Sequence, residues 1–380
     1  MKASWPTVRL GEVLRHRKEF VLIDDPVEYA RPRVRLHAQG IVLRDRVPGA
    51  LIKTKRQQVC RPGELLVAEI DAKAGGFGIV PTELEGSIVS SHYFLYQVLD
   101  SRLDVRFLDF YVRTSGFMEQ VQAQGTTNYA AIRPSDVLNY DIPLPPIAEQ
   151  RRIVARIEEL AAHIAEARAL REQAAEQQET LVISTHLKLA GSRTRELGDI
   201  LHLDEDKTPV APDGSYPQVG VRSFGGGLFP KSAVAGNETT YKAFNRLYEG
   251  ALLLSQVKGW EGAVAVCPKA LAGWFVSPEY RTFRCVPSEV RPGYMAALIR
   301  TEWFWGRLAK ATRGVGARRE RTRPEQFLSI EIPMPSVEQQ AVAEQVFAGL
   351  DAIKDLRTET SVALDALMPA ILDRAFKGDL

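Results

Sequence analysis

Apolar residues recur along the chain with two different spacings, and these spacings predict where strands and helices lie. Short runs rich in β-branched and aromatic residues, separated by Gly and Pro, predict strands over 64–70, 78–80, 93–98, 251–257 and 263–266. Helical spacing with aromatic faces predicts single helices over 107–121 and 294–309. Each helix is followed by a short strand that proline closes, over 141–145 and 331–335.

Two much longer helices are predicted after these proline-bounded strands. One begins near Glu149 and meets no Gly or Pro up to residue 190, with an apolar stripe of Ile153, Ile157, Leu160, Ile164, Ala167 and Ala174. The other begins near Glu338, with a stripe of Val342, Val346, Leu350, Ile353, Leu356, Leu364, Leu367 and Ile371. We expect the two stripes to pair with each other. The alternative is that each stripe packs on its own globular block.

The chain also repeats itself once. Leu10-Gly11-Glu12-Val13 recurs as Leu197-Gly198-Asp199-Ile200, and Arg113-Thr114 recurs as Arg300-Thr301, both 187 positions later. Ile142-Pro143-Leu144-Pro145 recurs as Ile332-Pro333-Met334-Pro335 at an offset of 190. A period this long indicates a duplicated domain and not a solenoid unit of about 20–50 residues.

These patterns predict an α+β fold with a pseudo-two-fold internal repeat. Two mixed α/β domains, residues 1–145 and 191–334, are separated by two long antiparallel helices that form a coiled coil. The central helix occupies residues 146–190 and the C-terminal helix residues 335–380.

Composition narrows the class of protein. The 380 residues are 45% hydrophobic, which excludes a disordered chain, and no apolar run is long enough to span a membrane. The first residues lack the apolar core of a signal peptide. Three cysteines without a CxxC pair predict buried thiols in a reducing compartment. We therefore expect a cytoplasmic protein.

Charge points towards a polyanionic partner. Residues 191–334 contain 20 Lys and Arg against 15 Asp and Glu, and basic clusters occur in both predicted domains. Arg31, Arg33 and Arg35 alternate, so an extended strand would place them on one face. Arg and Lys neutralise phosphates, and Arg and Asn also bind base edges. The candidate DNA-binding residues are Arg31, Arg33, Arg35, Lys53, Lys55, Arg56, Lys73, Asn128, Tyr129, Lys258, Arg313, Arg318, Arg319 and Arg321.

The glycine-containing loops at 71–76 and 258–262 allow two interpretations: close approach to a ligand, or simple turns. Enzyme signatures are missing. The sequence contains no GxxxxGK[ST] phosphate loop, no HExxH and no GxSxG, so we expect no catalytic, cofactor-binding or metal-binding residues. The triglycine at 225–227 lacks the lysine and hydroxyl residue of a phosphate loop and predicts a turn.

In this order, the motifs resemble the DNA-specificity subunit of type I restriction–modification systems. The similar stretches are the segments 142–154, 371–380 and Ile70-Asp71-Ala72-Lys73-Ala74-Gly75-Gly76-Phe77-Gly78-Ile79-Val80-Pro81. The resemblance covers essentially the whole chain. It implies a non-catalytic subunit for phage defence, whose two target-recognition domains each read half of a split DNA site. It also implies that the long helices set the gap and dock two DNA methyltransferase subunits and restriction/translocase subunits.

S-adenosylmethionine, ATP and Mg²⁺ would then serve DNA methylation and cleavage in the partners, with no cofactor on this chain. The second domain has Lys258-Gly259-Trp260 where the first has Asp71-Ala72-Lys73, so we expect the two half-sites to differ. Three alternatives stay open: an adaptor for a methylation-only or other phage-defence complex, a stand-alone DNA-modifying enzyme, and a structural protein whose helices join two protein partners.

Overall fold

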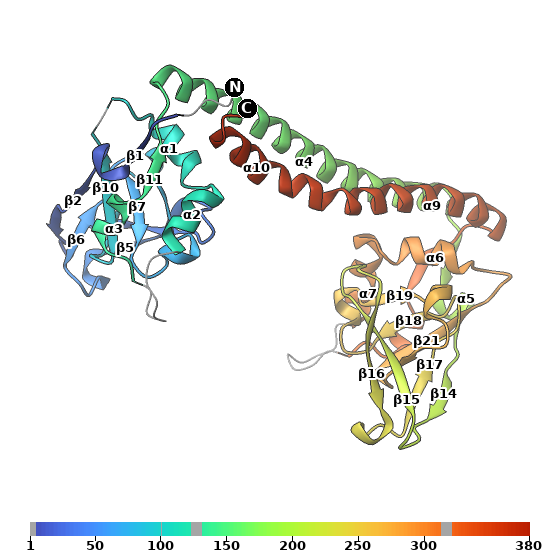
Figure 1. The fold of residues 1–380 in the computed structure, drawn as a ribbon. Helices are drawn as coiled ribbons and strands as arrows, with labels where there is room; N and C mark the ends of the chain where they lie inside the picture. The colour runs from blue at the N-terminus through green and yellow to red at the C-terminus, as the bar shows by residue number, and fades with distance from the viewer. Residues whose placement is uncertain (1–4, 100, 123–130, 313–320) are drawn as a thin grey trace. The chain divides into compact units, whose positions relative to one another are not determined.

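The computed structural model describes residues 5–99, 101–122, 131–312 and 321–380, which form two compact units (Figure 1). Unit 1 contains Met1–Arg168 and Ser361–Leu380, and unit 2 contains Ala169–Thr360. Each unit therefore combines a globular block with parts of the long helices. The predicted domain boundaries at residues 145, 190 and 334 concern the blocks alone and stay predictions.

Unit 1 is built on small antiparallel sheets. The central one has the order β2 (Leu14–Arg17), β10 (Tyr93–Val98), β7 (Leu65–Ala68) and β8 (Phe77–Ile79). A second sheet contains β3 (Phe20–Leu22), β6 (Arg56–Val59) and β9 (Ile88–Val89), and the hairpin of β4 (Glu28–Val34) and β5 (Ile41–Pro48) stands beside them. The proline-bounded strand β11 (Asp141–Pro143) pairs with β1 (Thr7–Arg9).

Three short helices cover the central sheet of unit 1: α1 (Val105–Tyr111), α2 (Ser115–Gln122) and α3 (Pro134–Leu138). Asp104 caps α1 by accepting hydrogen bonds from the backbone N–H groups of Arg106 and Phe107. Pro134 begins α3, where a missing N–H leaves no bond unmade. The core beneath these helices is rich in aromatic residues, and the Phe77 and Phe117 rings meet edge to face at 5.0 Å.

Unit 2 repeats this design. Its central sheet has the order β13 (Leu201–Leu203), β21 (Tyr280–Cys285), β18 (Leu252–Ser255) and β19 (Val264–Val266). A five-stranded sheet contains β14 (Asp206–Pro209), β17 (Ala243–Arg246), β20 (Phe275–Val276), β15 (Ser215–Val221) and β16 (Leu228–Ala235). The remaining pair is β12 (Thr194–Glu196) with β22 (Glu331–Pro333). The short helices are α5 (Leu197–Ile200), α6 (Pro292–Leu298), α7 (Glu302–Thr312) and α8 (Pro324–Leu328).

The internal repeat predicted from the sequence is therefore present in the structure. The β4–β5 hairpin and the β15–β16 hairpin begin and end 187 positions apart, as do α1 and α6. The offset becomes 190 at α3 and α8, because α7 has 11 residues and its counterpart α2 has 8. The three cysteines are buried thiols, as predicted, and burial raises the pKa of each to about 11.

The prediction of one helix in each block over 107–121 and 294–309 is wrong, because each segment forms two helices. The break lies at the repeated Arg-Thr pair. The Thr114 hydroxyl donates to the carbonyl of Tyr111 at 2.7 Å and accepts from the backbone N–H of Phe117 at 3.2 Å. Thr301 does the same with Leu298 and Phe304. A threonine that hydrogen-bonds in both directions ends one helix and caps the next.

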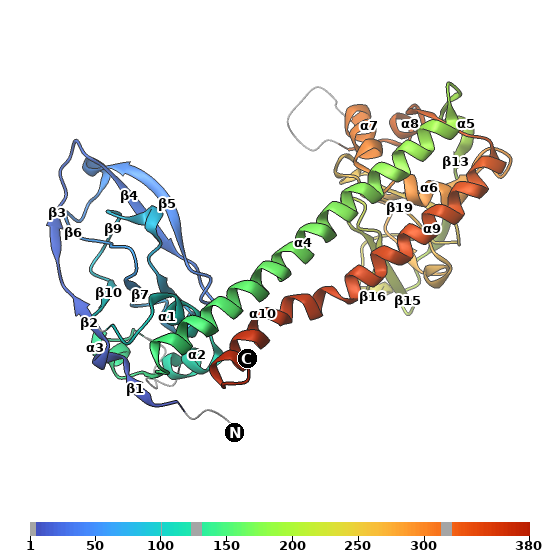
Figure 2. The ribbon, with the colours of Figure 1, turned by 90° about the horizontal axis from the view of Figure 1, so that it is seen from above.

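The long helices are α4 (Ile147–Ala190), α9 (Val337–Glu359) and α10 (Ser361–Phe376). Figures 1 and 2 both show α4 lying beside α10 and α9. In unit 1, Arg168 binds Asp365 at 3.0 Å; in unit 2, the Gln178 side chain donates to the carbonyl of Leu350 at 2.8 Å. Residue numbers fall on one helix as they rise on the other, so the pairs are antiparallel, as predicted.

The C-terminal helix, however, is not continuous. Its two parts meet at Thr360, whose hydroxyl donates to the carbonyl of Leu356 at 2.8 Å and accepts from Arg171 at 2.6 Å.

The predicted apolar stripes only partly face each other. On α4, Ile153 and Ile157 are buried in the core of the unit 1 block, as the alternative interpretation expected. On α9, Ala343 and Phe347 fill the core of unit 2. Four stripe residues of α9 point to solvent instead, with side chains between 45% and 63% exposed: Val342, Val346, Ile353 and Leu356. The helix therefore has two apolar faces, and we call this exposed set the α9 stripe.

Candidate nucleic-acid interface

A groove in unit 1 lies along the β4–β5 hairpin and has a volume of about 1020 Å³. Its polar lining combines four basic or imidazole side chains with a carboxylate and a phenol: Arg33, Arg35, His37, Arg44, Asp71 and Tyr93. Its apolar lining comes mainly from the hairpin, with Pro32, Val34, Leu36, Val42 and Leu43. We call this feature the hairpin groove.

Two backbone contacts hold the hairpin tip against the loop that follows β7. The N–H of His37 donates to the carbonyl of Ala74 at 2.7 Å, and the N–H of Ala38 donates to the carbonyl of Gly75 at 2.9 Å. A Cβ at Gly75 would lie 2.7 Å from the backbone nitrogen of Ala38, and Gly75 has a φ of +80°. These glycines therefore serve a turn and a close approach between two chain segments, which decides between the two interpretations of this loop.

Arg33 and Arg35 line the hairpin groove and are exposed. Neither forms an ion pair with any residue that the structure describes. Arg44 lies across the groove and approaches Asp45 at 3.3 Å. Burial, with the charge of Asp71 adding to it and that of Arg44 opposing it, raises the pKa of Tyr93.

Arg31, the third alternating arginine, is used inside the hairpin. It forms a two-pronged pair with its cross-strand neighbour Asp45, with N–O distances of 2.8 and 2.7 Å. The hydrogen bonds of this pair raise the pKa of Arg31 and lower the pKa of Asp45. Arg31 therefore stabilises the strand pairing, whereas Arg33 and Arg35 line the groove.

The other predicted residues of unit 1 lie elsewhere. Lys55 binds Asp25 and donates to the carbonyl of Gly49, and the guanidinium of Arg56 lies 4.2 Å from the centre of the Phe20 ring. Lys53 is exposed and, like these two, does not line the groove. Lys73 is half-buried in the turn Ala72–Ala74, next to Asp71. Asn128 and Tyr129 lie outside the described residues.

In unit 2, Lys258 takes the position of Asp71 and approaches Glu261 at 3.6 Å. Arg321 binds Glu279 at 2.7 Å. Arg313, Arg318 and Arg319 lie outside the described residues. The sequence analysis missed Arg222, whose guanidinium lies 4.6 Å from the centre of the Phe229 ring. The repeat could have revealed it, because Arg222 follows Arg35 by the repeat offset of 187.

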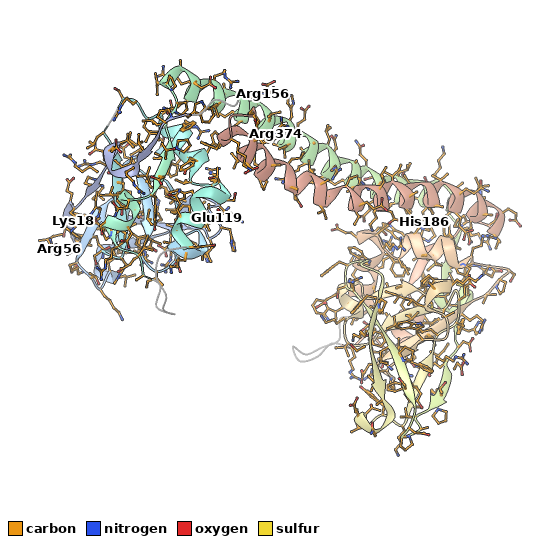
Figure 3. All side chains as sticks on the ribbon, viewed as in Figure 1. Lys18, Arg56, Glu119, Arg156, His186 and Arg374 are labelled. Carbon is orange, nitrogen blue, oxygen red and sulfur yellow. The ribbon has the colours of Figure 1, made fainter. Side chains whose placement is uncertain are left out.

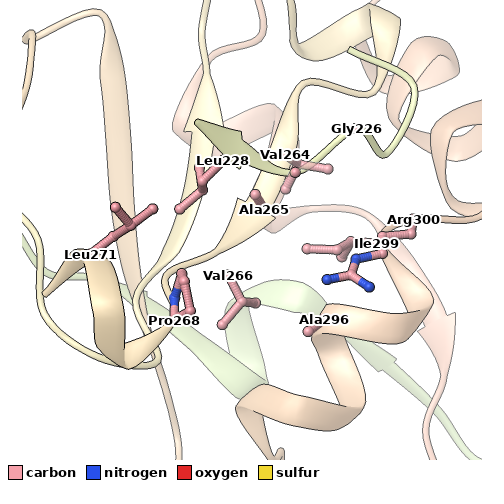
Figure 4. Close-up of a pocket in the computed structure, with 11 residues that line it drawn as sticks. Gly226, Leu228, Val264, Ala265, Val266, Pro268, Leu271, Ala296, Ile299 and Arg300 are labelled. Atoms are coloured by element: carbon pink, nitrogen blue, oxygen red, sulfur yellow. The ribbon is translucent and has the colours of Figure 1, made fainter. Parts of the chain in front are cut away.

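Unit 2 also has a pocket with a volume of about 300 Å³ (Figure 4). It is lined mainly by apolar residues, among them Val264 and Ala296, and by Arg300. The corresponding residues of unit 1 are the larger Phe77 and Asp109, and Asp109 binds Arg113 at 2.6 Å. Without this partner, Arg300 binds Asp351 of α9 at 3.1 Å. The pocket therefore arises from two smaller side chains.

The next two observations concern metal binding and membrane spanning. Among residues 5–99, 101–122, 131–312 and 321–380, no group of three His, Cys, Asp or Glu side chains could hold a metal ion. No helix in the described part of the chain has both the length and the apolar character needed to cross a membrane. The hairpin groove, with guanidinium donors and one carboxylate, is suited to binding and recognition of a polar polyanion.

The two-block architecture with long helices is the fold of the specificity subunits of type I restriction–modification systems. An HsdS subunit from Thermoanaerobacter tengcongensis is 23% identical, with a TM-score of 0.59, and the match covers 100% of this chain and 98% of that one. A structure described as the basis of complex assembly and conformational transition of the type I R-M system is 24% identical. Its TM-score is 0.72, and the match covers 100% of this chain and 99% of that chain. No protein-family model and no curated protein matches the chain.

Proposed function

We propose that the chain is the non-catalytic DNA-specificity subunit of a type I restriction–modification complex. Its two recognition domains read the halves of a bipartite, asymmetric site on double-stranded DNA. The observation that carries this proposal is the hairpin groove, because Arg33 and Arg35 face solvent there without a partner among the described residues. Unpaired arginines suit both phosphates and guanine edges. The fold shared with solved HsdS subunits supports the same function.

The long helices would dock two DNA methyltransferase subunits and, in a complete system, restriction/translocase subunits. The α9 stripe supports this role, since Val342, Val346, Ile353 and Leu356 leave apolar surface uncovered along one helix. Exposed apolar surface of this kind marks protein–protein interaction sites. S-adenosylmethionine, ATP and Mg²⁺ would be bound and used by those partners.

We further propose that α4 sets the gap between the two half-sites. Its 44 residues rise about 66 Å at 1.5 Å per residue. Two modest half-site contacts joined by a stiff spacer act as one bivalent contact.

Inserting four residues near Ala175 adds about one helical turn, and should lengthen the recognised gap while leaving both half-site sequences unchanged. The measurement is single-molecule sequencing of methylated adenines in cells that express the variant with its methyltransferase. An unchanged gap would contradict the spacer role. A four-residue insertion in an exposed loop of unit 2 is the control for nonspecific effects.

The test of the function itself uses the unaltered chain, co-expressed with the methyltransferase encoded beside it. We expect methylated adenines at one two-part sequence, and none when this chain is omitted. The purified chain is also incubated alone with labelled S-adenosylmethionine, or with Mg²⁺ and DNA. Methyl transfer or cleavage by the isolated chain would contradict the proposal and favour a stand-alone enzyme.

A further inference from the structure

Asp71 places a single carboxylate in the otherwise basic hairpin groove. Its side chain is exposed and makes no hydrogen bond or ion pair with a residue that the structure describes. Its backbone, in contrast, is fixed, because its carbonyl accepts hydrogen bonds from Ala74 at 3.0 Å and from Gly76 at 2.8 Å. A Cβ on Gly76 would lie 2.7 Å from that of Asp71, so this turn needs glycine there. The backbone that carries the carboxylate is therefore fixed, and no described residue uses its acceptor atoms.

The carboxylate at this position argues against a groove that only binds phosphates, because it repels them. Two negative charges about 4 Å apart repel each other by about 1 kcal/mol in water, and by more near a protein surface. A carboxylate among arginines is instead suited to the edge of a base pair. Cytosine presents an N4 amino group to an acceptor, and guanine presents O6 and N7 to an arginine.

Comparison with the hairpin of unit 2 shows which cations of the groove occur in both units and which occur in unit 1 alone. The hairpins have the same strand register near their tips, since Arg33 faces Val42 and the equivalent Gly220 faces Phe229. The register differs at the bulge, where Arg31 faces Asp45 but the equivalent Gln218 faces Lys231. Arg35 and Arg44 correspond to Arg222 and Lys231, so a cation is retained at both positions. Contacts common to two different half-sites are best explained as phosphate contacts, which carry no sequence information.

Arg33 and Asp71, in contrast, have no chemical counterpart in unit 2. Arg33 is replaced by Gly220, where a Cβ would lie 2.4 Å from the Phe229 ring, and Asp71 is replaced by Lys258. In unit 2 the space beside this backbone position is taken by an aromatic ring. We expect the residues that differ between the two recognition domains to be the ones that contact bases.

We infer that unit 1 reads a G·C base pair through the hairpin groove. Arg33 donates to O6 and N7 of the guanine, and the Asp71 carboxylate accepts from N4 of the paired cytosine. Arg35 and Arg44 bind neighbouring phosphates. This inference rests on the proposed function and adds the identity of one recognised base pair and the two residues that read it.

The test selects sequences from a random duplex pool with the full-length chain, co-expressed with its methyltransferase, and compares Arg33→Ala and Asp71→Asn. Each variant should lose about 5- to 150-fold of its preference at the same G·C position of one half-site, which is the discrimination of one good base contact. The other half-site should keep its preference, which shows that each variant is folded. Arg35→Ala is the matched control, with uniformly weaker binding and a salt slope lowered by about 1.

The outcomes separate the two claims. If the unaltered chain enriches no sequence, the proposed function fails. If it enriches a two-part sequence but Arg33→Ala and Asp71→Asn change different positions, or a position that is not G·C, the base-pair assignment is overturned. The assignment is also overturned if Asp71→Asn strengthens binding to all sequences equally, because the carboxylate then acts only by repelling phosphates.

Discussion

The two hairpins have nearly the same backbone and very different surfaces. Residues 28–48 contain five arginines and two acids, whereas residues 215–235 contain one arginine, one lysine and no acid. His37 and Phe224, equivalent residues at the two tips, both have positive φ angles, and each donates its N–H to the turn beside it. The interior contacts thus keep the hairpin in place while its outward side chains vary. A duplicated domain can change what it recognises without changing how it folds.

The same contrast occurs where each block meets the end of a long helix. In unit 1, the Phe376 ring of α10 lies 4.9 Å from the Phe107 ring. In unit 2 the equivalent residues are His186 of α4 (Figure 3), which is 0% exposed, and Tyr294. A hydrogen bond joins their side chains. Nε2 of His186 has no hydrogen-bond partner among the described residues. The pair Phe107–Phe376 is therefore apolar, whereas the equivalent pair Tyr294–His186 is polar and titratable.

The largest effect is expected from Phe107→Ala, which should cost unit 1 about 3–5 kcal/mol because it leaves a cavity under α1. Four of the five tryptophans lie in unit 2, at 260, 274, 303 and 305. We therefore expect the variant to shift the urea midpoint seen by far-UV circular dichroism more than the midpoint seen by fluorescence. Equal shifts of both midpoints would show that the two units unfold together.

Acid should lower the stability of unit 2 at the His186–Tyr294 junction, by less than Phe107→Ala lowers the stability of unit 1. Burial, with the charge of Arg307 adding to it, lowers the pKa of His186 to about 4. The unfolded chain then takes up this proton near pH 6.5 and the folded chain only near pH 4. Stability is therefore lost as the pH falls through this window, by about 3 kcal/mol in total. The measurement is the fluorescence-detected urea midpoint at pH 7 and pH 4.5.

The matched control for this acid effect converts the unit 2 junction into that of unit 1, with His186→Phe and Tyr294→Phe together. Titration of carboxylates is common to both proteins and cancels in the comparison. The double variant should lose less stability between pH 7 and pH 4.5 than the original chain. An identical loss would rule out His186 as the titrating group.

The smallest effects are expected from the two capping threonines. Thr114→Ala and Thr301→Ala should each cost about 0.5–2 kcal/mol, because each removes a cap with the same hydrogen bonds. Substitution by serine keeps the hydroxyl and should restore most of the loss. The check is chemical denaturation of the four variants. A large difference between the two alanine variants would show that the blocks do not share this feature equally.

Much of the fold could be predicted from the sequence, because the repeat and the periodicity report local structure. The strand predicted over 93–98 is β10, and the proline-bounded strands end at Pro143 and Pro333. The helix breaks at Thr114 and Thr301 were missed because the apolar pattern continues through both Arg-Thr pairs. The exposure of the α9 stripe was missed because one helix has two apolar faces.

Only some of the residues that line the hairpin groove could be predicted from the sequence. Arg33 and Arg35 stand out as alternating arginines, but Asp71 joins them only because the hairpin tip hydrogen-bonds to Ala74 and Gly75. Arg44 joins them through the pairing of β4 with β5. A contact between segments this far apart in sequence leaves no periodic signal. Arg31 carries the same sequence signal as Arg33, and only the structure shows that Asp45 already binds it.

The division of the long helices between the units has a consequence for synthesis on the ribosome. Residues 5–168 emerge early, yet Leu372 and Ala375 are part of the core that they form, and the Phe376 ring packs on Phe107. The first block therefore keeps part of its apolar interior uncovered until residues 372–376 have been synthesised. Unit 2, whose chain is uninterrupted from 169 to 360, can close first. The order of folding would then be the reverse of the order of synthesis.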